Sequence, residues 1–204
     1  MTRSRILAAA QTVPVRGDVD ANRDQHMRLA ALAADADAGV LVFPELSLTG
    51  YELDLGAALA FEASDARLTP LADAARTSGV TLVAGAPVRV EGRLHIGAFV
   101  LTPGGARDVY TKHHLAAFSP RDGPAGFEPI TEPSVFEPGT LDPLVAVGDT
   151  TAGHRAACPL RAAVRSWSAE GKCLVEADAA GAGIVVARES DAGWSGKAMR
   201  LGGA

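Results

Sequence analysis

Glu45 stands where a carboxylate can take part in chemistry. It follows the apolar run Val40–Phe43 and Pro44, which together predict a buried strand that stops at the proline. Ligand sites of α/β sheets lie in the crevice beyond the carboxyl ends of such strands. Partial burial there disfavours the ionised carboxyl, raises its pKa and favours a role as a general base. The alternative is a structural glutamate that caps the next turn or pairs with a surface arginine.

Lys112 is the second candidate, because it directly follows another predicted strand, Asp108–Tyr110, and can point into the same crevice. A lysine ammonium that faces a developing oxyanion in a water-poor site is an electrostatic catalyst. The alternative is a solvated lysine at a strand end. His113 and His114 come next, and adjacent residues of an extended segment face opposite ways, so they cannot chelate one metal ion together. We expect both histidines to be structural or to support neighbouring side chains.

The chain has two cysteines, Cys158 and Cys173. Cys158 ends the short run His154–Cys158 before Pro159, a layout that presents a nucleophile at a strand end. If Lys112 lies nearby, its charge favours the thiolate, which is the attacking species. The alternative is a buried, unreactive thiol. Cys173 alternates with its neighbours as a core residue of a strand does, so we expect it to be inert.

The elements that position these residues begin with a β-α-β pattern. Hydrophobic spacing predicts two helices, Asp20–Asp37 and Thr69–Ser78. Apolar runs bounded by turn residues predict strands at Ile6–Thr12, Val40–Phe43, Val80–Ala84, Val88–Val90, Leu94–Leu101, Asp108–Tyr110, Leu144–Val147, His154–Cys158, Ala162–Ser168, Cys173–Ala177 and Ile184–Arg188. The Pro- and Gly-rich stretch Gly123–Pro143 predicts a long surface loop. We expect one domain over residues 1–204, of the mixed α/β class and built in layers.

Three motifs stand in order along the chain: Phe43-Pro44-Glu45-Leu46 with Gly50-Tyr51, Tyr110-Thr111-Lys112-His113-His114-Leu115, and Val135-Phe136-Glu137-Pro138-Gly139. Their composition and order resemble those of the nitrilase superfamily of carbon-nitrogen hydrolases. The segments Leu7–Gln11, Trp167–Gly171 and Ile184–Ala187 are similar to the first and closing strands of that family. Separations of 67 residues from Glu45 to Lys112 and of 46 from Lys112 to Cys158 are compatible with its catalytic triad.

The resemblance implies an αββα sandwich that hydrolyses nonpeptide amides or nitriles without a metal ion or organic cofactor. Carried over by motif, Glu45 would be the general base, Lys112 would stabilise the tetrahedral intermediate, and Cys158 would form the acyl-enzyme. Glu132 would correspond to a second glutamate that some members place beside the lysine. The implied function is hydrolysis of a small-molecule amide or carbamoyl-amide rather than a nitrile, by a homo-oligomer.

The chain departs from the family pattern after Cys158. In the family, the nucleophile is followed by an acidic or aromatic residue and by further βα structure, whereas here Pro159 follows and Trp167 comes soon after. About two βα units, each of roughly 30 residues, are missing before the closing strands. We therefore expect a sandwich that is incomplete in its C-terminal half. This leaves open a second interpretation, a catalytically inactive family member that acts as a binding or oligomerisation subunit.

Composition excludes several other functions. The 204 residues include 19 Lys and Arg against 24 Asp and Glu, and the basic residues are scattered, so we expect no nucleic-acid surface. No apolar run reaches the roughly 18 residues of a membrane span, and Ile6–Ala10 is too short for a secretory signal, so we expect a cytoplasmic protein without membrane contact. Residues 11–17 contain one glycine, which excludes the dinucleotide-binding fingerprint.

Overall fold

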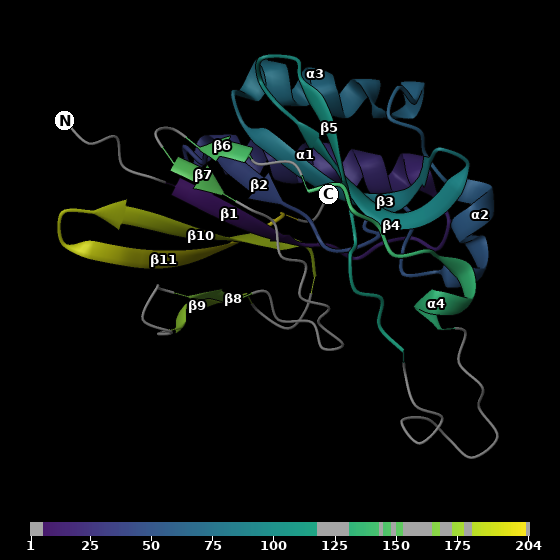
Figure 1. The fold of residues 1–204 in the computed structure, drawn as a ribbon. Helices are drawn as coiled ribbons and strands as arrows, with labels where there is room; N and C mark the ends of the chain where they lie inside the picture. The colour runs from purple at the N-terminus through teal and green to yellow at the C-terminus, as the bar shows by residue number, and fades with distance from the viewer. Residues whose placement is uncertain are drawn as a thin grey trace.

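A mixed seven-stranded sheet is the centre of the structure, a computed structural model that describes residues 6–117, 131–142, 145–147, 150–152, 165–167, 173–177 and 181–202 (Figure 1). The strand order is β11-β10-β1-β2-β3-β4-β5. β1, β2 and β3 are parallel, and the other neighbouring pairs are antiparallel. The strands are β1 Ile6–Gln11, β2 Val40–Val42, β3 Thr81–Val90, β4 Arg93–Leu101, β5 Arg107–Thr111, β10 Gly183–Ser190 and β11 Gly193–Arg200.

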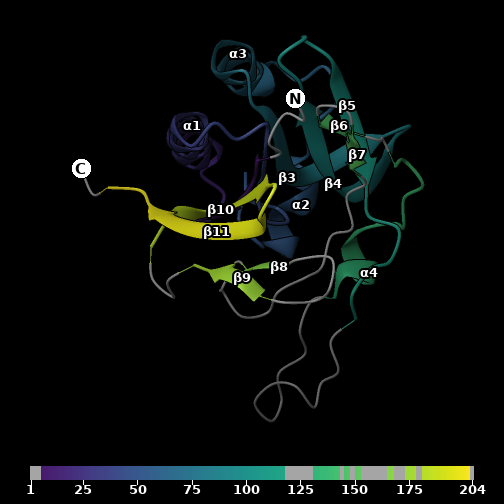
Figure 2. The ribbon, with the colours of Figure 1, turned by 90° about the vertical axis from the view of Figure 1, so that its left-hand side faces the viewer.

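Two helices, α1 (Val19–Asp35) and α3 (Thr69–Ser78), pack side by side on one face of this sheet (Figure 2). Between β2 and α3 the chain makes the short helical turns Leu53–Leu55, α2 (Gly56–Leu59) and Ala66–Leu68. The main core lies between the helices and the sheet, and its fully buried side chains include Leu29, Leu71, Leu82 and Phe99. Burial of one such side chain contributes about 1.5–3 kcal/mol to the stability of the fold. The mixed α/β class predicted from the sequence is confirmed.

The ends of both helices follow from the local sequence. The Asp18 carboxylate accepts a hydrogen bond from the Ala21 amide at 3.0 Å and so caps the first turn of α1. Gly79 ends α3 in the left-handed region, with a φ of 71° that glycine adopts without steric cost. The predicted helix Thr69–Ser78 is confirmed in full, and Asp20–Asp37 is confirmed with slightly different ends.

The strand β3 is longer than the sequence predicts. The sequence predicts separate strands at Val80–Ala84 and Val88–Val90, because Gly85 and Pro87 commonly interrupt strands. In the structure both residues lie inside β3, since β4 pairs with it from Leu82 to Val90. Pro87 lacks an amide hydrogen, and its carbonyl accepts a hydrogen bond from the Phe61 amide at 2.9 Å. Pairing with β4 and the hydrogen bond from Phe61 therefore keep the strand continuous across Gly85 and Pro87.

The C-terminal part adds strands that the sequence predicts only in part. β6 (Val145–Val147) pairs with β7 (Thr150–Ala152), and β8 (Arg165–Trp167) pairs with β9 (Cys173–Glu176). β7 and β11 were not predicted, and the residues of β11 are mostly exposed, so no hydrophobic alternation marks that strand. The predicted strand His154–Cys158 lies outside the described residues. None of the described helices is long and apolar enough to cross a membrane.

The segment predicted as a surface loop, Gly123–Pro143, is partly built into the fold. Residues 118–130 lie outside the described part of the chain, but residues 131–142 contain α4 (Glu132–Val135) and a stretch beside the sheet. Backbone hydrogen bonds that involve residues 137, 139 and 141 join this stretch to β4 and to the end of β5. Glu132 and Phe136 are buried. The surface-loop prediction is therefore wrong for this half, because Phe136 anchors the segment in a small apolar cluster.

Candidate active site

Glu45 is held in a tight turn just beyond β2. The next residue, Leu46, has a φ of 54°, and strained conformations of this kind cluster at functional sites. The turn closes through a hydrogen bond from the Ser47 amide to the Pro44 carbonyl oxygen at 3.2 Å. Gly85 of β3 passes so close that a Cβ there would lie 2.4 Å from that same oxygen. These contacts fix the backbone from which the Glu45 side chain extends.

Lys112 lies directly after β5, and backbone hydrogen bonds hold it on both sides. Its amide donates to the Ile96 carbonyl oxygen at 2.7 Å, and its carbonyl accepts from the Gly139 amide at 2.8 Å. β5 runs in the same direction as β2, because two antiparallel steps separate it from β3. The carboxyl ends of both strands therefore reach one edge of the sheet. Lys112 is 6% exposed, so it is not the solvated lysine of the alternative interpretation.

Glu132 reaches the same place from the start of α4. Its side chain is fully buried and accepts two short hydrogen bonds, from the Tyr51 hydroxyl at 2.5 Å to Oε1 and from the Ala116 amide at 2.6 Å to Oε2. The structure thus places Glu132 beside the lysine, as the family resemblance implied. The contact of Tyr51 with Glu132 was not anticipated, since the sequence shows Tyr51 only as part of the first motif.

Lys112 Nζ joins the two carboxylates into one buried group, the Glu45–Lys112–Glu132 cluster. Nζ lies 3.1 Å from Oε1 and 2.9 Å from Oε2 of Glu45, and 3.0 Å from Oε1 and 2.9 Å from Oε2 of Glu132. Of the two Glu45 oxygens, only Oε1 has hydrogen-bond geometry with Nζ. Oε2 is buried and accepts no hydrogen bond within the described part of the chain. This oxygen is available to accept a proton.

The surroundings of the two carboxyl groups separate their pKa values. Burial raises the pKa of Glu45, and the hydrogen bond and charge of Lys112 only partly offset this. Burial acts in the same direction on Glu132, but hydrogen bonds from Tyr51, Ala116 and Lys112 outweigh it and lower the pKa of Glu132. Burial works against the charge of Lys112, yet the two carboxylates raise its pKa. Glu132 and Lys112 therefore stay charged, and Glu45 is the member suited to exchange a proton.

The predicted cysteine sites have different outcomes. Cys158 lies outside the described residues. Cys173 is exposed on β9, so the prediction that it is a core residue of a strand is wrong. Its apolar neighbours Leu174 and Val175 are only half-buried, because β9 lies at the periphery of the fold, against β11.

The histidines that follow Lys112 lie in different surroundings. His113 is half-buried and stacks on Tyr110 with 5.7 Å between ring centroids, whereas His114 is exposed. Within the described ranges, no group of three or more His, Cys, Asp or Glu side chains is placed to hold a metal ion. Tyr110, in contrast, belongs to the wall beside the Glu45–Lys112–Glu132 cluster.

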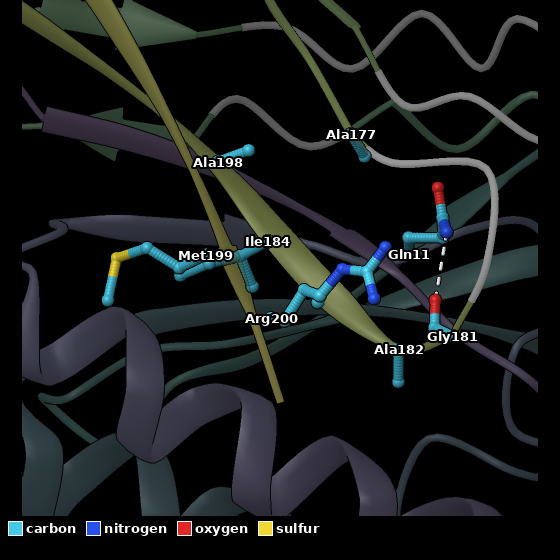
Figure 3. A pocket seen from close by; sticks show the side chains of 9 residues that line it. Gln11, Ala177, Gly181, Ala182, Ile184, Ala198, Met199 and Arg200 are labelled. Carbon is cyan, nitrogen blue, oxygen red and sulfur yellow. Dashed lines mark hydrogen bonds between the residues drawn. The ribbon is translucent and has the colours of Figure 1, made fainter. Parts of the chain in front are cut away.

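Two cavities lie near the carboxyl ends of the parallel strands. A cavity of about 20 Å³, enough for one water molecule, is lined by Glu45 and Lys112 together with residues of β3, β4 and β5. A larger cavity of about 300 Å³ lies beyond the end of β1, where Arg200 extends from β11 toward Gln11 (Figure 3). The larger cavity includes no member of the Glu45–Lys112–Glu132 cluster in its wall. Of these two cavities, the smaller one is therefore where a group could contact both the Glu45 carboxylate and the Lys112 ammonium.

Residues 6–188 match the family described as carbon-nitrogen hydrolase. This match covers most of the chain, and the chain therefore belongs to the carbon-nitrogen hydrolase family. The membership confirms the resemblance to the nitrilase superfamily drawn from the motifs around Glu45, Lys112 and Phe136.

Several solved structures share this fold. The NitN amidase from Neterenkonia sp. AN1 is 26% identical, with a TM-score of 0.58 over 73% of this chain and 55% of the amidase. The glutamine-dependent NAD⁺ synthetase from Acinetobacter baumannii is 24% identical, with a TM-score of 0.58 over 74% of this chain and 27% of the synthetase. XC1258 from Xanthomonas campestris, a CN-hydrolase superfamily protein with an arsenic adduct in its active site, is 19% identical, with a TM-score of 0.59 over 73% of this chain and 52% of that protein. The similarities to the synthetase and to XC1258, both below 25% identity, show the fold alone. This chain spans about half the length of the amidase.

Proposed function

We propose that this chain hydrolyses a small nonpeptide amide or carbamoyl-amide through a thioester acyl-enzyme on Cys158. The observation that carries the proposal is the buried cluster in which one lysine contacts two carboxylates whose pKa values move in opposite directions. Membership of the carbon-nitrogen hydrolase family supports it. So does a variant of the amidase from Nesterenkonia sp. AN1, in which the acetamide moiety of fluoroacetamide is covalently added at the active-site cysteine.

In the proposed acylation, Glu45 takes the proton of the Cys158 thiol, and the thiolate attacks the carbonyl carbon of the amide. The ammonium of Lys112 stabilises the oxyanion of the tetrahedral intermediate. When the intermediate collapses, the C–N bond breaks and protonated Glu45 gives its proton to the departing amine. Glu132 keeps Lys112 charged and oriented, and Tyr51 holds Glu132 in place.

Deacylation uses the same groups with water as the nucleophile. A water molecule attacks the thioester carbonyl while Glu45 accepts its proton, and Lys112 again stabilises the oxyanion. Collapse of this second intermediate breaks the C–S bond, releases the carboxylic acid and returns the proton from Glu45 to the sulfur. A base with a raised pKa suits both steps, because it must accept a proton and release it in each half of the cycle.

The test uses the purified full chain, a panel of short aliphatic amides and carbamoyl-amides, and detection of released ammonia. We expect turnover by the unmodified chain and a loss of several orders of magnitude in Cys158→Ala, because removal of a nucleophile abolishes covalent catalysis. Cys173→Ala is the matched control, since Cys173 is exposed on β9, and it should retain full activity. Ammonia release that persists undiminished in Cys158→Ala would refute the assignment of the nucleophile.

A second candidate function is that of an inactive binding or oligomerisation subunit. It is favoured by the length of the chain, which covers 55% of the NitN amidase. Clear thiol-dependent turnover of any amide in the panel eliminates this candidate. Absence of turnover from a chain that unfolds cooperatively supports it instead.

A further inference from the structure

A buried imidazole that the proposed chemistry does not use, His26 of α1, contacts the turn that carries Glu45. His26 is 0% exposed. Its Nε2 lies 2.9 Å from the Ser47 hydroxyl oxygen, and its ring stacks on Phe43 with 4.0 Å between centroids and an interplanar angle of 24°. Phe43 and Ser47 stand two residues before and two residues after Glu45. One side chain of the helix thus contacts both flanks of the turn.

The hydrogen bonds of His26 fix the protonation of its ring. Nδ1 lies 2.7 Å from the carbonyl oxygen of Asn22, which can only accept, so Nδ1 carries the hydrogen. In the neutral ring Nε2 is then an acceptor, and the Ser47 hydroxyl donates to it. Burial lowers the pKa of His26 from 6.5 to about 4, although the Asn22 carbonyl partly opposes this. Both ring nitrogens are therefore satisfied by a neutral imidazole.

The turn needs this support because its backbone is strained. A left-handed conformation such as that of Leu46 persists only where the surroundings over-determine it. From the sheet side, the Gly85 carbonyl accepts a hydrogen bond from the Leu48 amide at 3.0 Å. From the helix side, the Asn22 side-chain amide donates to the Leu48 carbonyl oxygen at 3.2 Å, and His26 binds the Ser47 side chain. The turn is held between α1 and β3.

We propose that His26 is a positioning residue, which holds the turn from Phe43 to Leu48 against α1 and thereby sets the place of the Glu45 carboxylate beside Lys112. An apolar side chain of similar volume would fill the same space without placing polar nitrogens in the core, so packing alone does not account for a histidine here. The hydrogen bond between His26 and the Ser47 hydroxyl explains why a histidine stands at this position. The kinetic consequences rest on the proposed function, whereas the effect on the position of Glu45 does not.

The experiment separates the hydrogen bond from the packing. His26→Phe keeps a ring that can stack on Phe43 but removes the acceptor, and Ser47→Ala removes the donor. We expect kcat for the amide substrate to fall about 10- to 100-fold in each variant with KM little changed, since displacement of a catalytic group by about 1 Å can cost that much. The double variant should lose no more than either single variant, because both lose the same bond. His26→Gln, which restores an acceptor oxygen, should recover part of the loss.

Leu29→Ala is the matched control, because Leu29 is a fully buried residue of the same helix whose side chain cannot form a hydrogen bond with the turn. It should destabilise the fold while leaving kcat unchanged at temperatures well below unfolding. A kcat that is also unchanged in His26→Phe and Ser47→Ala overturns the proposal. The proposal is also overturned if kcat falls as much in Leu29→Ala as in His26→Phe and Ser47→Ala. If His26→Phe does not fold, Ser47→Ala alone decides.

A readout that needs no activity distinguishes failure of this inference from failure of the proposed function. The carboxyl carbon of Glu45, assigned by its loss in Glu45→Gln, is titrated by ¹³C NMR in the unmodified chain and in Ser47→Ala. We expect its raised pKa to move toward the ordinary value in the variant, because a released turn admits water to the carboxylate. If the chain hydrolyses no amide, the proposed function fails while such a movement still supports the positioning role. An unchanged Glu45 pKa in that case overturns it.

Discussion

At Lys112, one cation balances two carboxylates that are almost completely shielded from water. Burying charges is costly, and only close pairing with opposite charge and hydrogen bonds offsets that cost. The Tyr51 hydroxyl and the Ala116 amide supply further donors on the Glu132 side. Burial raises the pKa of Glu45, and because fewer donors among the described residues oppose it there, Glu45 is the more easily protonated of the two. Two identical side chains thus have pKa values that move in opposite directions.

Removal of the cation should destabilise the whole fold. In Lys112→Met the two carboxylates face each other in a buried site without a counter-charge, a situation that costs about 3–5 kcal/mol. We expect the free energy of unfolding at pH 7, measured by urea denaturation, to fall by about this amount. The loss should shrink near pH 4, where the carboxyl groups can protonate.

The control for this variant is Lys112→Met combined with Glu132→Gln, which removes one of the opposed charges. We expect the double variant to regain part of the stability that Lys112→Met loses. A single variant as stable as the unmodified chain would show that the ion pairs do not hold the fold together.

Tyr51→Phe should weaken the cluster more gently. The hydroxyl donates to Glu132 at 2.5 Å, and its removal takes away one of the hydrogen bonds that lower the pKa of Glu132. The residue is 39% exposed, so water can partly replace the hydroxyl, and we expect a loss of only about 1 kcal/mol in unfolding free energy. The kcat for the amide substrate should fall several-fold, because a less firmly charged Glu132 orients Lys112 less well. A variant that matches the unmodified chain in both measurements would contradict this role of Tyr51.

At the scale of elements, the two candidates that directly follow strands were predictable, and the third was not. Glu45 and Lys112 each come after a clear apolar run, and the parallel direction of β2 and β5 brings them to one edge of the sheet. Glu132 lies in a Pro- and Gly-rich stretch whose composition indicates an exposed loop, and only the family resemblance indicated a site residue there. Its burial depends on Phe136 and on backbone pairing with β4 and β5, which are contacts between distant parts of the chain.

His26 illustrates what local patterns cannot provide. In the sequence it is a polar residue inside a predicted helix, and nothing nearby indicates that the helix turns it inward. Its role becomes visible only when α1 packs beside the turn after β2. Helix ends, in contrast, depend on residues within one or two positions, which is why the end of α3 at Ser78 could be predicted from the sequence alone.

The close packing of β3 against the turn after β2 gives a prediction for Gly85. In Gly85→Ala the new methyl group would lie 2.4 Å from the Pro44 carbonyl oxygen and 2.7 Å from the Leu46 amide nitrogen, so strand and turn must separate. We expect a loss of about 1–3 kcal/mol in unfolding free energy from overpacking, together with a marked fall in kcat. Gly104→Ala is the control, because its new methyl group would approach only the Thr102 hydroxyl oxygen, at 3.9 Å. Equal behaviour of the two variants would contradict the requirement for glycine at position 85.

For the whole molecule, the groups that make the site are also those that make its stability depend on pH. The pKa of Glu132 is lowered, so its contribution is present above the ordinary value and is lost as the pH falls through the lowered one. Glu45, with a raised pKa, acts in the opposite direction, because the folded state takes up its proton first as the pH falls. The pKa of Lys112 is raised, so its contribution is lost only as the pH rises through that raised value.

His26 should govern the acid side of this profile between pH 6.5 and 4. The unfolded chain protonates the imidazole near its ordinary pKa of 6.5, whereas the folded chain resists until about pH 4. Folding stability should therefore fall by about 2–3 kcal/mol between pH 7.5 and pH 4.5. The measurement is urea denaturation across this range in Glu45→Gln, which removes the opposing contribution of Glu45, with and without His26→Phe. If the free energy of unfolding depends just as steeply on pH in His26→Phe, protonation of His26 is not the cause of the loss of stability.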